Sequence, residues 1–514
     1  MGLRIRAACA VIALVALAAC AARAARVDPA ALVRAHDLVR QGCYGCLLAA
    51  RETYEGMAAA DRADAVALRL FEVHLLIALR EKELGVDSSG SLDRARALLP
   101  RLHPQAARYL ELVAAVPPDE AGAPKKVLGE YLTTLLREEF RPPALGWVRQ
   151  GVLEPLVREY VAVAVECGRA VLTGRDAPES AIDAPILTYR RAICPATPDA
   201  TALESLRDTP SGYGDAALFL ARAALVSREG AAASVTSKTS AAARAYLEEA
   251  AASFPRSASI AYELGRVAQI EGDLRRAAGQ YSRALDLQPD HEDARLGRAM
   301  ALSYLTQPDA AVADATVLID SGAYNRGEAF YWRAFNRHRA KDLEAARADI
   351  EQAKRLALSS RVLTLAGMIE RDQGELSAAV LDLTQAVALD GANCAARWYL
   401  GVVRHAGEEW LESGVAFGGA ARCYDAAALR SERGRDEMAA RTDVDEEFRA
   451  RQLEGFEAAI KEDRSQESAA ALNAAIGYAL GGDRGTADKY LDQAAKDPER
   501  RMAVADLRQV LKAP

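Results

Sequence analysis

The chain has 514 residues, of which 51% are hydrophobic, 27% are charged and 6% are aromatic, and its formal net charge is −7. This acidic balance, without any run of five or more basic residues, argues against nucleic acid as a partner. The length would suit several globular domains, although a solenoid of stacked repeats grows by addition and can reach the same length as one array.

The first 20 residues have the pattern of an export signal. Arg4 and Arg6 precede an apolar run, and residues 17–20 read Leu-Ala-Ala-Cys. The run is too short to span a bilayer comfortably, which takes about 20 residues, and residues 17–20 resemble the lipobox of bacterial lipoproteins. The resemblance implies that residues 1–19 are a lipoprotein signal peptide and that Cys20 carries the acyl chains, palmitate among them. An uncleaved anchor and an ordinary signal peptide remain the alternatives.

The residue after Cys20 bears on the location of the chain. An Asp there often retains such lipoproteins at the inner membrane, and Ala21 stands in its place. More than one acyl chain is needed for stable anchoring. The resemblance therefore implies a protein of the bacterial cell envelope, lipid-anchored at the outer membrane through Cys20 and facing the periplasm.

Residues 20–214 are predicted to form an N-terminal helical region. The spacing of Cys43 and Cys46 occurs in redox, zinc and haem sites, and each of these makes a further demand. Haem attachment needs a His at the next position, where Leu47 stands, and zinc needs a second pair of ligands, which is missing. Redox catalysis of the thioredoxin type needs a βαβ setting. A local disulfide at a helix start is the favoured interpretation, with redox catalysis as the alternative.

The second half of the chain is organised by a repeat. A small residue is followed by a second small residue 12 positions on, and usually by an Ala 19 positions on. The starts lie 33 to 35 residues apart, which indicates a solenoid of helix-turn-helix repeats. Only small residues allow the two helices of a pair to cross closely, and the residue 16 positions after each start is mostly large. The starts are Gly265, Ala299, Ala334, Gly367 and Gly401.

The first of these repeats resembles a tetratricopeptide repeat. Residues 261–265 read Ala-Tyr-Glu-Leu-Gly and are followed by Gly272, Leu274, Ala277, Tyr281, Ala284 and Pro289. The match extends to about residue 425 and returns near the C-terminus, with Ala475, Tyr478, Gly482, Ala487, Leu491 and Ala494. The resemblance implies an all-α fold, a right-handed α-solenoid of helix-turn-helix repeats with an additional N-terminal helical region.

The domain boundaries follow from the extent of this match. The array is predicted to span residues 215–425, with a degenerate repeat at 215–255. Residues 426–514 are predicted to hold C-terminal helices, a last repeat and a capping helix. Whether residues 20–214 continue the solenoid or form a separate domain stays open.

Six cysteines remain once Cys9 is removed with the signal peptide and Cys20 is acylated. An even number of thiols in an oxidising, exported compartment favours disulfides. Cys394 begins the first helix of one predicted repeat and Cys423 ends its second helix, so antiparallel packing would bring them together. The disulfide candidates are Cys43, Cys46, Cys167, Cys194, Cys394 and Cys423, with the 394–423 pair favoured first and the 167–194 pair second.

In tetratricopeptide solenoids the first helices line a concave groove that usually holds a peptide. The resemblance therefore implies a groove that binds a protein segment here, and its side chains are largely aromatic and basic on an acidic chain. Such side chains tend to dominate binding energy, so we expect an acidic segment with apolar anchors. The alternative is that these long side chains only cover the exposed helices and bind no partner. The predicted residues are Tyr262, Arg266, Gln269, Tyr331, Phe335, His338, Arg339, Arg371, Trp398 and His405.

Motifs of catalysis are missing from the sequence: there is no nucleophile elbow, phosphate-binding glycine loop or paired-His metal motif. We therefore expect neither an enzyme nor a bound cofactor or metal. The predicted function is that of a membrane-anchored periplasmic scaffold that binds peptide segments of envelope proteins. The alternative is a solute- or glycan-capturing lipoprotein of an uptake system.

Overall fold

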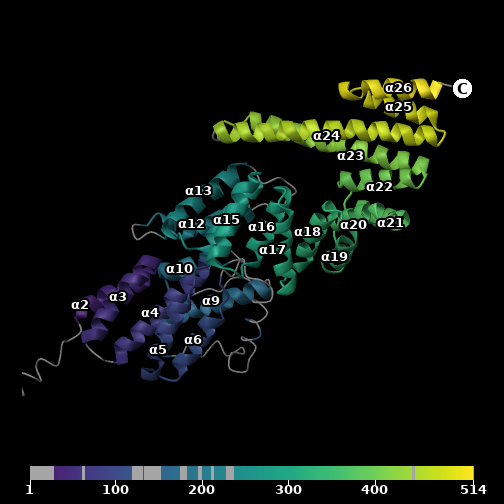
Figure 1. The fold of residues 1–514 in the computed structure, drawn as a ribbon. Coiled ribbons are helices and arrows are strands. Elements are labelled where there is room, and N and C mark those ends of the chain that lie inside the picture. Colours follow the sequence, from purple (N-terminus) through teal and green to yellow (C-terminus); the bar gives the residue numbers. More distant parts are fainter. Residues whose placement is uncertain are drawn as a thin grey trace, which may run out of the picture. The chain divides into compact units, whose positions relative to one another are not determined.

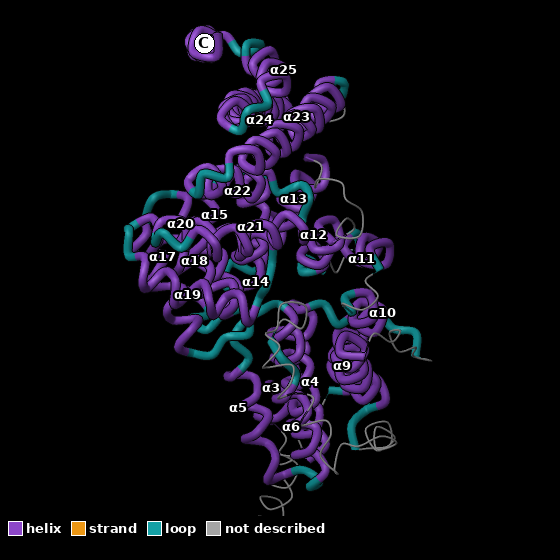
Figure 2. Tube along the Cα trace, turned by 90° about the vertical axis from the view of Figure 1, so that its right-hand side faces the viewer, coloured by secondary structure: helices purple, strands orange, loops and turns teal. Residues whose placement is uncertain are grey.

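The computed structural model describes residues 28–60, 64–118, 131, 133, 152–173, 182–194, 199–209, 213–226, 237–442 and 446–512. Every regular element in these ranges is a helix (Figures 1 and 2), which confirms the all-α prediction. The predicted signal peptide and Cys20 lie outside the described residues. Among the described helices, none has both the length and the hydropathy needed to cross a membrane.

Two compact units make up the chain. Unit 1 comprises Met1–Ser234, Ala241–Val267 and Arg283–Asp290, and unit 2 comprises Val235–Ser240, Ala268–Ser282 and His291–Pro514. The predicted boundary near residue 214 therefore lies within unit 1.

Unit 1 is built around α4, which is buried at every position from Leu70 to Arg80. A helix that is buried on all sides belongs to the centre of a helical assembly. The helices of this unit are α2 (Pro29–Gln41), α3 (Tyr44–Ala60), α4 (Asp64–Glu83), α5 (Ser89–Leu98), η1 (Leu99–Arg101), α6 (Gln105–Ala115), α9 (Pro155–Thr173), α10 (Pro185–Ala192), α11 (Ala200–Arg207), α12 (Ala216–Val226) and most of α13 (Ser237–Ser253). Residues of α14 (Ala258–Ile270) and α15 (Leu274–Leu287) belong to both units.

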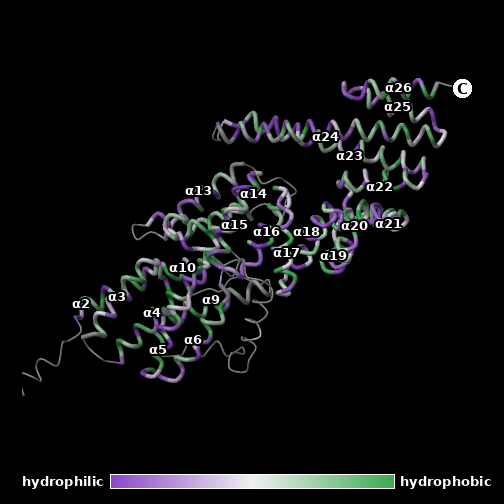
Figure 3. Tube along the Cα trace, in the orientation of Figure 1, coloured by the Kyte–Doolittle hydropathy of each residue, from purple (hydrophilic) through white to green (hydrophobic). Residues whose placement is uncertain are grey.

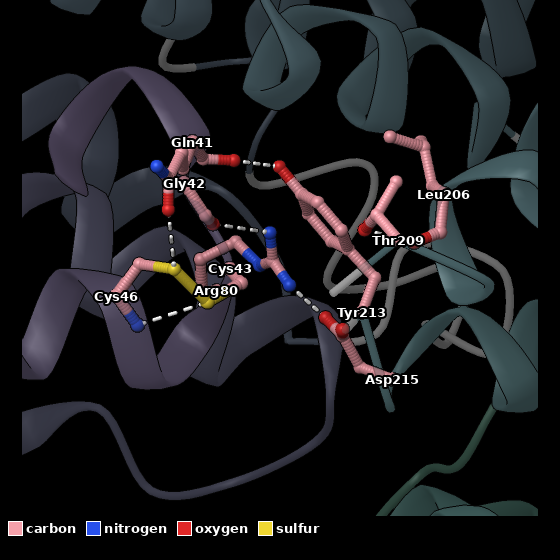
Figure 4. The surroundings of a disulfide bond; sticks show 9 residues. All are labelled: Gln41, Gly42, Cys43, Cys46, Arg80, Leu206, Thr209, Tyr213 and Asp215. Carbon is pink, nitrogen blue, oxygen red and sulfur yellow. Dashed lines mark hydrogen bonds and ion pairs between the residues drawn. A yellow bond between two sulfur atoms is a disulfide. The ribbon is translucent and has the colours of Figure 1, made fainter. Parts of the chain in front are cut away.

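A fully buried arginine of α4 connects distant parts of unit 1 (Figure 4). The Arg80 guanidinium donates to the Gly42 carbonyl oxygen at 3.0 Å and to the Asp215 carboxylate, and it lies 3.8 Å from the centroid of the Tyr189 ring. A buried charge is tolerated only when it is paired and hydrogen-bonded. These contacts join the turn after α2 and the segment before α12 to the central helix.

The Cys43–Cys46 disulfide lies in the turn between α2 and α3, beside the contacts of Arg80 (Figure 4). Nearby, the Tyr213 hydroxyl donates to the Gln41 carbonyl oxygen. Both half-cystines are buried, at 5% and 6% exposure, so the bond is part of the packing at this turn. Two further disulfides join Cys167 to Cys194 in unit 1 and Cys394 to Cys423 in unit 2, the pairings that the sequence favours.

Unit 2 is a series of helix pairs. Each helix carries both hydrophobic and hydrophilic residues along its length (Figure 3), as an amphipathic helix packed on a neighbour requires. The helices are α16 (Glu292–Tyr304), α17 (Pro308–Asp320), α18 (Arg326–Arg339), α19 (Leu343–Leu356), α20 (Ser360–Asp372), α21 (Leu376–Leu389), α22 (Cys394–Ala406), α23 (Trp410–Ala439), α24 (Glu446–Leu480), α25 (Arg484–Ala494), η3 (Pro498–Arg500) and α26 (Arg501–Lys512).

The small residues of the repeat lie at the helix crossings. A Cβ atom added at Gly367 would lie 2.5 Å from Leu383 Cγ, and one added at Gly401 would lie 2.7 Å from Phe417 Cγ. Each large residue is the one 16 positions after the small residue. The large residue therefore packs directly on the small residue of its own helix pair. A larger side chain at the position of the small residue would collide with it.

In two helix pairs, an ion pair between a half-buried arginine and a buried aspartate joins the two helices, which the sequence analysis missed. Arg298 binds both carboxylate oxygens of Asp314 at 2.7 Å, and Arg333 binds those of Asp349 at 2.9 and 2.7 Å. Bidentate contacts of this kind fix the geometry of the two side chains and also stabilise the pair. In both pairs the Arg lies one position before the small residue of the repeat, and the Asp lies 16 positions after the Arg.

The regular pairs end at α23 and α24, which are 30 and 35 residues long and pack on each other. Their backbones approach closely, because a Cβ atom added at Gly477 would lie 2.6 Å from the backbone nitrogen of Gly414. Cys423 lies inside α23 and not at its end, since the helix runs on to Ala439. In α26, Val504 is buried while Met502 is 78% exposed, so the helix packs one face on the preceding helices.

Candidate functional site

The structure divides the ten predicted binding residues between the two units. Tyr262 and Arg266 belong to unit 1, where Arg266 pairs with Glu263 at 2.9 Å. Gln269 belongs to unit 2 and accepts a hydrogen bond from the Tyr281 hydroxyl at 2.8 Å, so it joins two helices. The other seven lie on α18, α20 and α22, the first helices of three successive pairs in unit 2.

Aromatic side chains gather where α18 meets the end of α16. The ring of Tyr304 lies 5.5 Å from that of Trp332, and the rings of Tyr331 and Phe335 are stacked 6.5 Å apart. Tyr331 and Trp332 are only 7% and 2% exposed, whereas Tyr304 is 57% exposed. The predicted anchor Tyr331 therefore belongs to the core of the array. The aromatic surface that remains accessible is that of Tyr304 and the half-buried Phe335.

Two arginines border these rings. The Arg361 guanidinium lies 4.2 Å from the centroid of the Tyr331 ring and pairs with Glu328. Arg339 lies 5.6 Å from the Phe335 ring and donates to the Ser303 carbonyl oxygen at 2.9 Å. Contacts with aromatic faces hold the planes of both arginines in place.

His338 and Arg371 converge on one carboxylate, that of Asp372. His338 Nε2 lies 2.9 Å from Asp372 Oδ2, Arg371 donates two hydrogen bonds to Oδ1, and Lys341 Nζ lies 3.4 Å from Oδ2. Partial burial opposes ionisation, but the hydrogen bonds from Arg371 and His338 outweigh it and hold the pKa of Asp372 below its usual range. This carboxylate is therefore saturated by its neighbours.

The last two predicted residues lie on α22 and contact α23. The Trp398 ring meets that of Phe417 edge to face at 5.3 Å, and the His405 ring meets that of Trp410 at 5.0 Å. Both are half-buried. Their role includes packing between the two helices, in addition to any contact with a partner.

Sequence reasoning missed three residues of this surface, Tyr304, Lys341 and Arg361. Tyr304 and Arg361 could have been found from the repeat register. Tyr304 follows the small residue Ala299 by five positions, as Arg339 follows Ala334. Arg361 precedes Gly367 by six positions. We define the first-helix face as the solvent-accessible side chains of Tyr304, Phe335, Lys341, Arg339 and Arg361, together with the saturated Asp372.

Within the described ranges, no three or more side chains of His, Cys, Asp or Glu are grouped so that they could hold a metal ion. The polar groups of the first-helix face are paired with one another and with aromatic rings.

The helix pairs of unit 2 form a regular array. From α16 to α21 each pair consists of two helices of 13 or 14 residues. In the α20–α21 pair the small residue Gly367 meets the large residue Leu383, 16 positions later. These are the features that the resemblance implied. The array is a solenoid of helix-turn-helix repeats, as the sequence predicts.

Solved structures of helical-repeat proteins are similar to this chain. The APC/C hetero-tetramer Cut9-Hcn1 has 14% identity over 95% of this chain and 97% of that chain, with a TM-score of 0.41. PilF of Pseudomonas aeruginosa has 14% identity over 49% and 96%, with a TM-score of 0.35. YrrB, a TPR protein with an unusual peptide-binding site, has 15% identity over 51% and 97%, with a TM-score of 0.26. No protein-family model and no curated protein matches the sequence.

Proposed function

We propose that this protein is a scaffold that docks other proteins of the cell envelope through its first-helix face. The observation that carries the proposal is the side-by-side placement of accessible aromatic and arginine side chains on successive first helices. Tyr and Arg are enriched among the residues that dominate protein interfaces, and charged residues placed on aromatic rings lose little further freedom on binding.

The charges of this face favour an acidic segment as the partner. Arg339 is exposed, and the side chains of Arg361 and Lys341 are 47% and 75% exposed. The acidic neighbours are Glu328, which pairs with Arg361, and Asp372, which is saturated. An acidic segment would gain attraction from the three cations, and an apolar side chain in it would find Tyr304 and Phe335.

We further propose that the chain is lipid-anchored on Cys20 at the outer membrane and faces the periplasm. The lipobox-like residues 17–20 support the anchor. The three disulfides support an oxidising compartment, because such bonds are rare where thiols are kept reduced. Labelling of the wild-type chain with a palmitate analogue, compared with the Cys20→Ala variant, tests the anchor. Equal labelling of the two would refute it.

The docking proposal is tested by crosslinking in cells followed by mass spectrometry. The variant combines Tyr304→Ala, Arg339→Glu and Arg361→Glu, which change accessible side chains and leave the buried Tyr331 intact. The matched control is Arg355→Glu, an exposed arginine on the second helix α19.

We expect protein partners that are crosslinked to the wild-type and control chains and are lost from the triple variant. For an isolated partner segment, the triple change should weaken binding by at least tenfold. Retention of every partner by the triple variant would refute docking through this face.

A further inference from the structure

A cavity of about 290 Å³ lies in unit 1, whereas the first-helix face belongs to unit 2. It is lined by residues of α2, α3, α4 and α9 and by residues 154 and 182 beside them. Its volume equals that of about ten water molecules in the liquid and lies just below the range of about 300–1,000 Å³ typical of drug-sized ligands. A ligand of this cavity would therefore be small.

Three charged groups of the lining bind one another. Arg69 donates a hydrogen bond of 2.6 Å to the buried Glu72 carboxylate and pairs with the Glu154 carboxylate. The backbone nitrogen of Glu154 donates a second hydrogen bond of 2.6 Å to Glu72. Burial and the nearby charge of Arg69 lower the pKa of His36, so this ring adds no charge to the lining at pH 7. This part of the lining is therefore occupied by its own contacts.

Two other charged side chains of the lining are not paired with each other. Asp37 and Arg40 are exposed residues of α2. Residues three positions apart lie on the same face of a helix, with about 5–6 Å between their Cβ atoms. Arg40 donates one hydrogen bond of 2.6 Å to the Asp183 carbonyl oxygen, whereas Asp37 forms neither a hydrogen bond nor an ion pair with any described residue. The Asp37 carboxylate and further N–H groups of Arg40 are therefore available to a ligand.

The accessible lining also has an aliphatic part. Leu156 and Ile182 are half-buried, and Val39 is 8% exposed. Apolar walls with a few well-placed polar groups are the usual composition of small-molecule sites, in which the polar groups fix the orientation of the ligand. A ligand that suits this cavity therefore combines an aliphatic part with groups that bind Asp37 and Arg40.

A ligand with a single charge would use only half of the two unpaired side chains. A simple cation would bind Asp37 and leave Arg40 without an anionic partner. A simple anion would meet three carboxylates and only two guanidiniums in the lining, which opposes its binding. The two side chains together are complementary to a molecule that carries both charges.

We propose that the cavity in unit 1 binds a free α-amino acid with an aliphatic side chain, its ammonium on Asp37 and its carboxylate on Arg40. Both charged groups of an α-amino acid are attached to one carbon atom, so two side chains three positions apart on one helix contact them together. The aliphatic side chain lies against Leu156 and Ile182. This binding activity is separate from protein docking, and it does not depend on the first-helix face.

The experiment compares L-leucine with three probes that each lack one of its groups. The carboxylate is absent from 3-methylbutylamine, the ammonium from 4-methylpentanoate, and the side chain from glycine. Binding to the full chain is measured by ligand-observed NMR titration at pH 7. We expect L-leucine to bind most tightly and each of the other probes to bind about tenfold more weakly, because one charge-assisted hydrogen bond or one apolar contact is lost.

Two variants assign the two contacts. Asp37→Asn should weaken the binding of L-leucine about tenfold and should not weaken that of 4-methylpentanoate, which has no ammonium. Arg40→Gln should weaken the binding of L-leucine by a similar factor and should not weaken that of 3-methylbutylamine, which has no carboxylate. The matched control is Arg34→Gln, because Arg34 is an exposed arginine of α2 that does not line the cavity. It should leave all four affinities unchanged.

The three substitutions change exposed side chains, so the variants should keep the fold of the wild type. The proposal is overturned if L-leucine does not bind, if either singly charged probe binds as tightly as L-leucine, or if Asp37→Asn or Arg40→Gln binds L-leucine as the wild type does. An equal loss in Arg34→Gln would also overturn it, because the effect would then come from the net charge of α2 and not from the cavity.

Discussion

The crossing of α20 and α21 allows a sharp test of the packing that builds the array. In the Gly367→Ala variant the new Cβ would lie 2.5 Å from Leu383 Cγ and 3.0 Å from both Cδ atoms of that residue. Replacement of Gly by Ala inside a helix stabilises by about 1 kcal/mol. Overpacking of a close-packed crossing costs about 1–3 kcal/mol. The net effect in the wild-type background is therefore a loss of up to about 2 kcal/mol.

In a background that carries Leu383→Ala, the effect of Gly367→Ala on stability should change from a loss to a gain. Leu383 is fully buried, so Leu383→Ala alone should cost about 2–5 kcal/mol. Once the colliding atoms are removed, Gly367→Ala should stabilise by about 1 kcal/mol through helix propensity. The two changes should thus show a coupling free energy of about 1–3 kcal/mol.

Hydrogen exchange read by mass spectrometry on peptides of α20 and α21 measures the local opening free energy at this crossing. The control is Gly279→Ala in α15, where an added Cβ meets nothing within 4 Å and Ala should stabilise by about 1 kcal/mol. A Gly367→Ala effect that is the same in both backgrounds would refute the argument that the crossing requires glycine.

Three further predictions concern other features of unit 2. The Cys394→Ala, Cys423→Ala double variant should lose about 3–4 kcal/mol of unfolding free energy in urea titrations, because the bond closes a loop with a sequence separation of 29, and an unchanged midpoint would contradict this. Asp349→Ala should cost about 3–5 kcal/mol because it leaves Arg333 and Arg337 without the carboxylate that they share. Replacement of the whole group by Arg333→Met, Arg337→Met and Asp349→Leu should be close to neutral, and equal losses in the two variants would refute the ion-pair argument. Burial raises the pKa of Glu370 to about 7. The unfolded chain releases this proton near pH 4.3, whereas the folded chain still holds it. The free energy of unfolding should therefore fall as the pH rises from about 4.5 to 7. Urea midpoints at pH 5 and pH 7.5 should therefore differ more in the wild type than in Glu370→Gln, and equal differences would exclude Glu370 as the cause.

The helix pairs could be predicted from the sequence, because the pattern that specifies them is local. The spacing of small and large residues, such as Gly367 and Leu383, follows directly from the length of two helices and the turn between them. The same pattern places Cys394 and Cys423 close together in one antiparallel helix pair, and so favoured their pairing. These features depend on residues within one repeat, and a repeat can be recognised from about 34 consecutive residues.

Which side chains are accessible and which are buried could not be predicted from the repeat pattern, because it depends on packing between helix pairs. Helical position assigns Tyr331 and Tyr304 to similar faces, but Trp332 and Arg361 cover the first and leave the second in solvent. The buried contact of Arg80 with Asp215 likewise joins residues that are 135 positions apart in the chain. Periodicity specifies the direction of a side chain from its helix axis, whereas the depth at which it lies depends on neighbours that the local pattern does not contain.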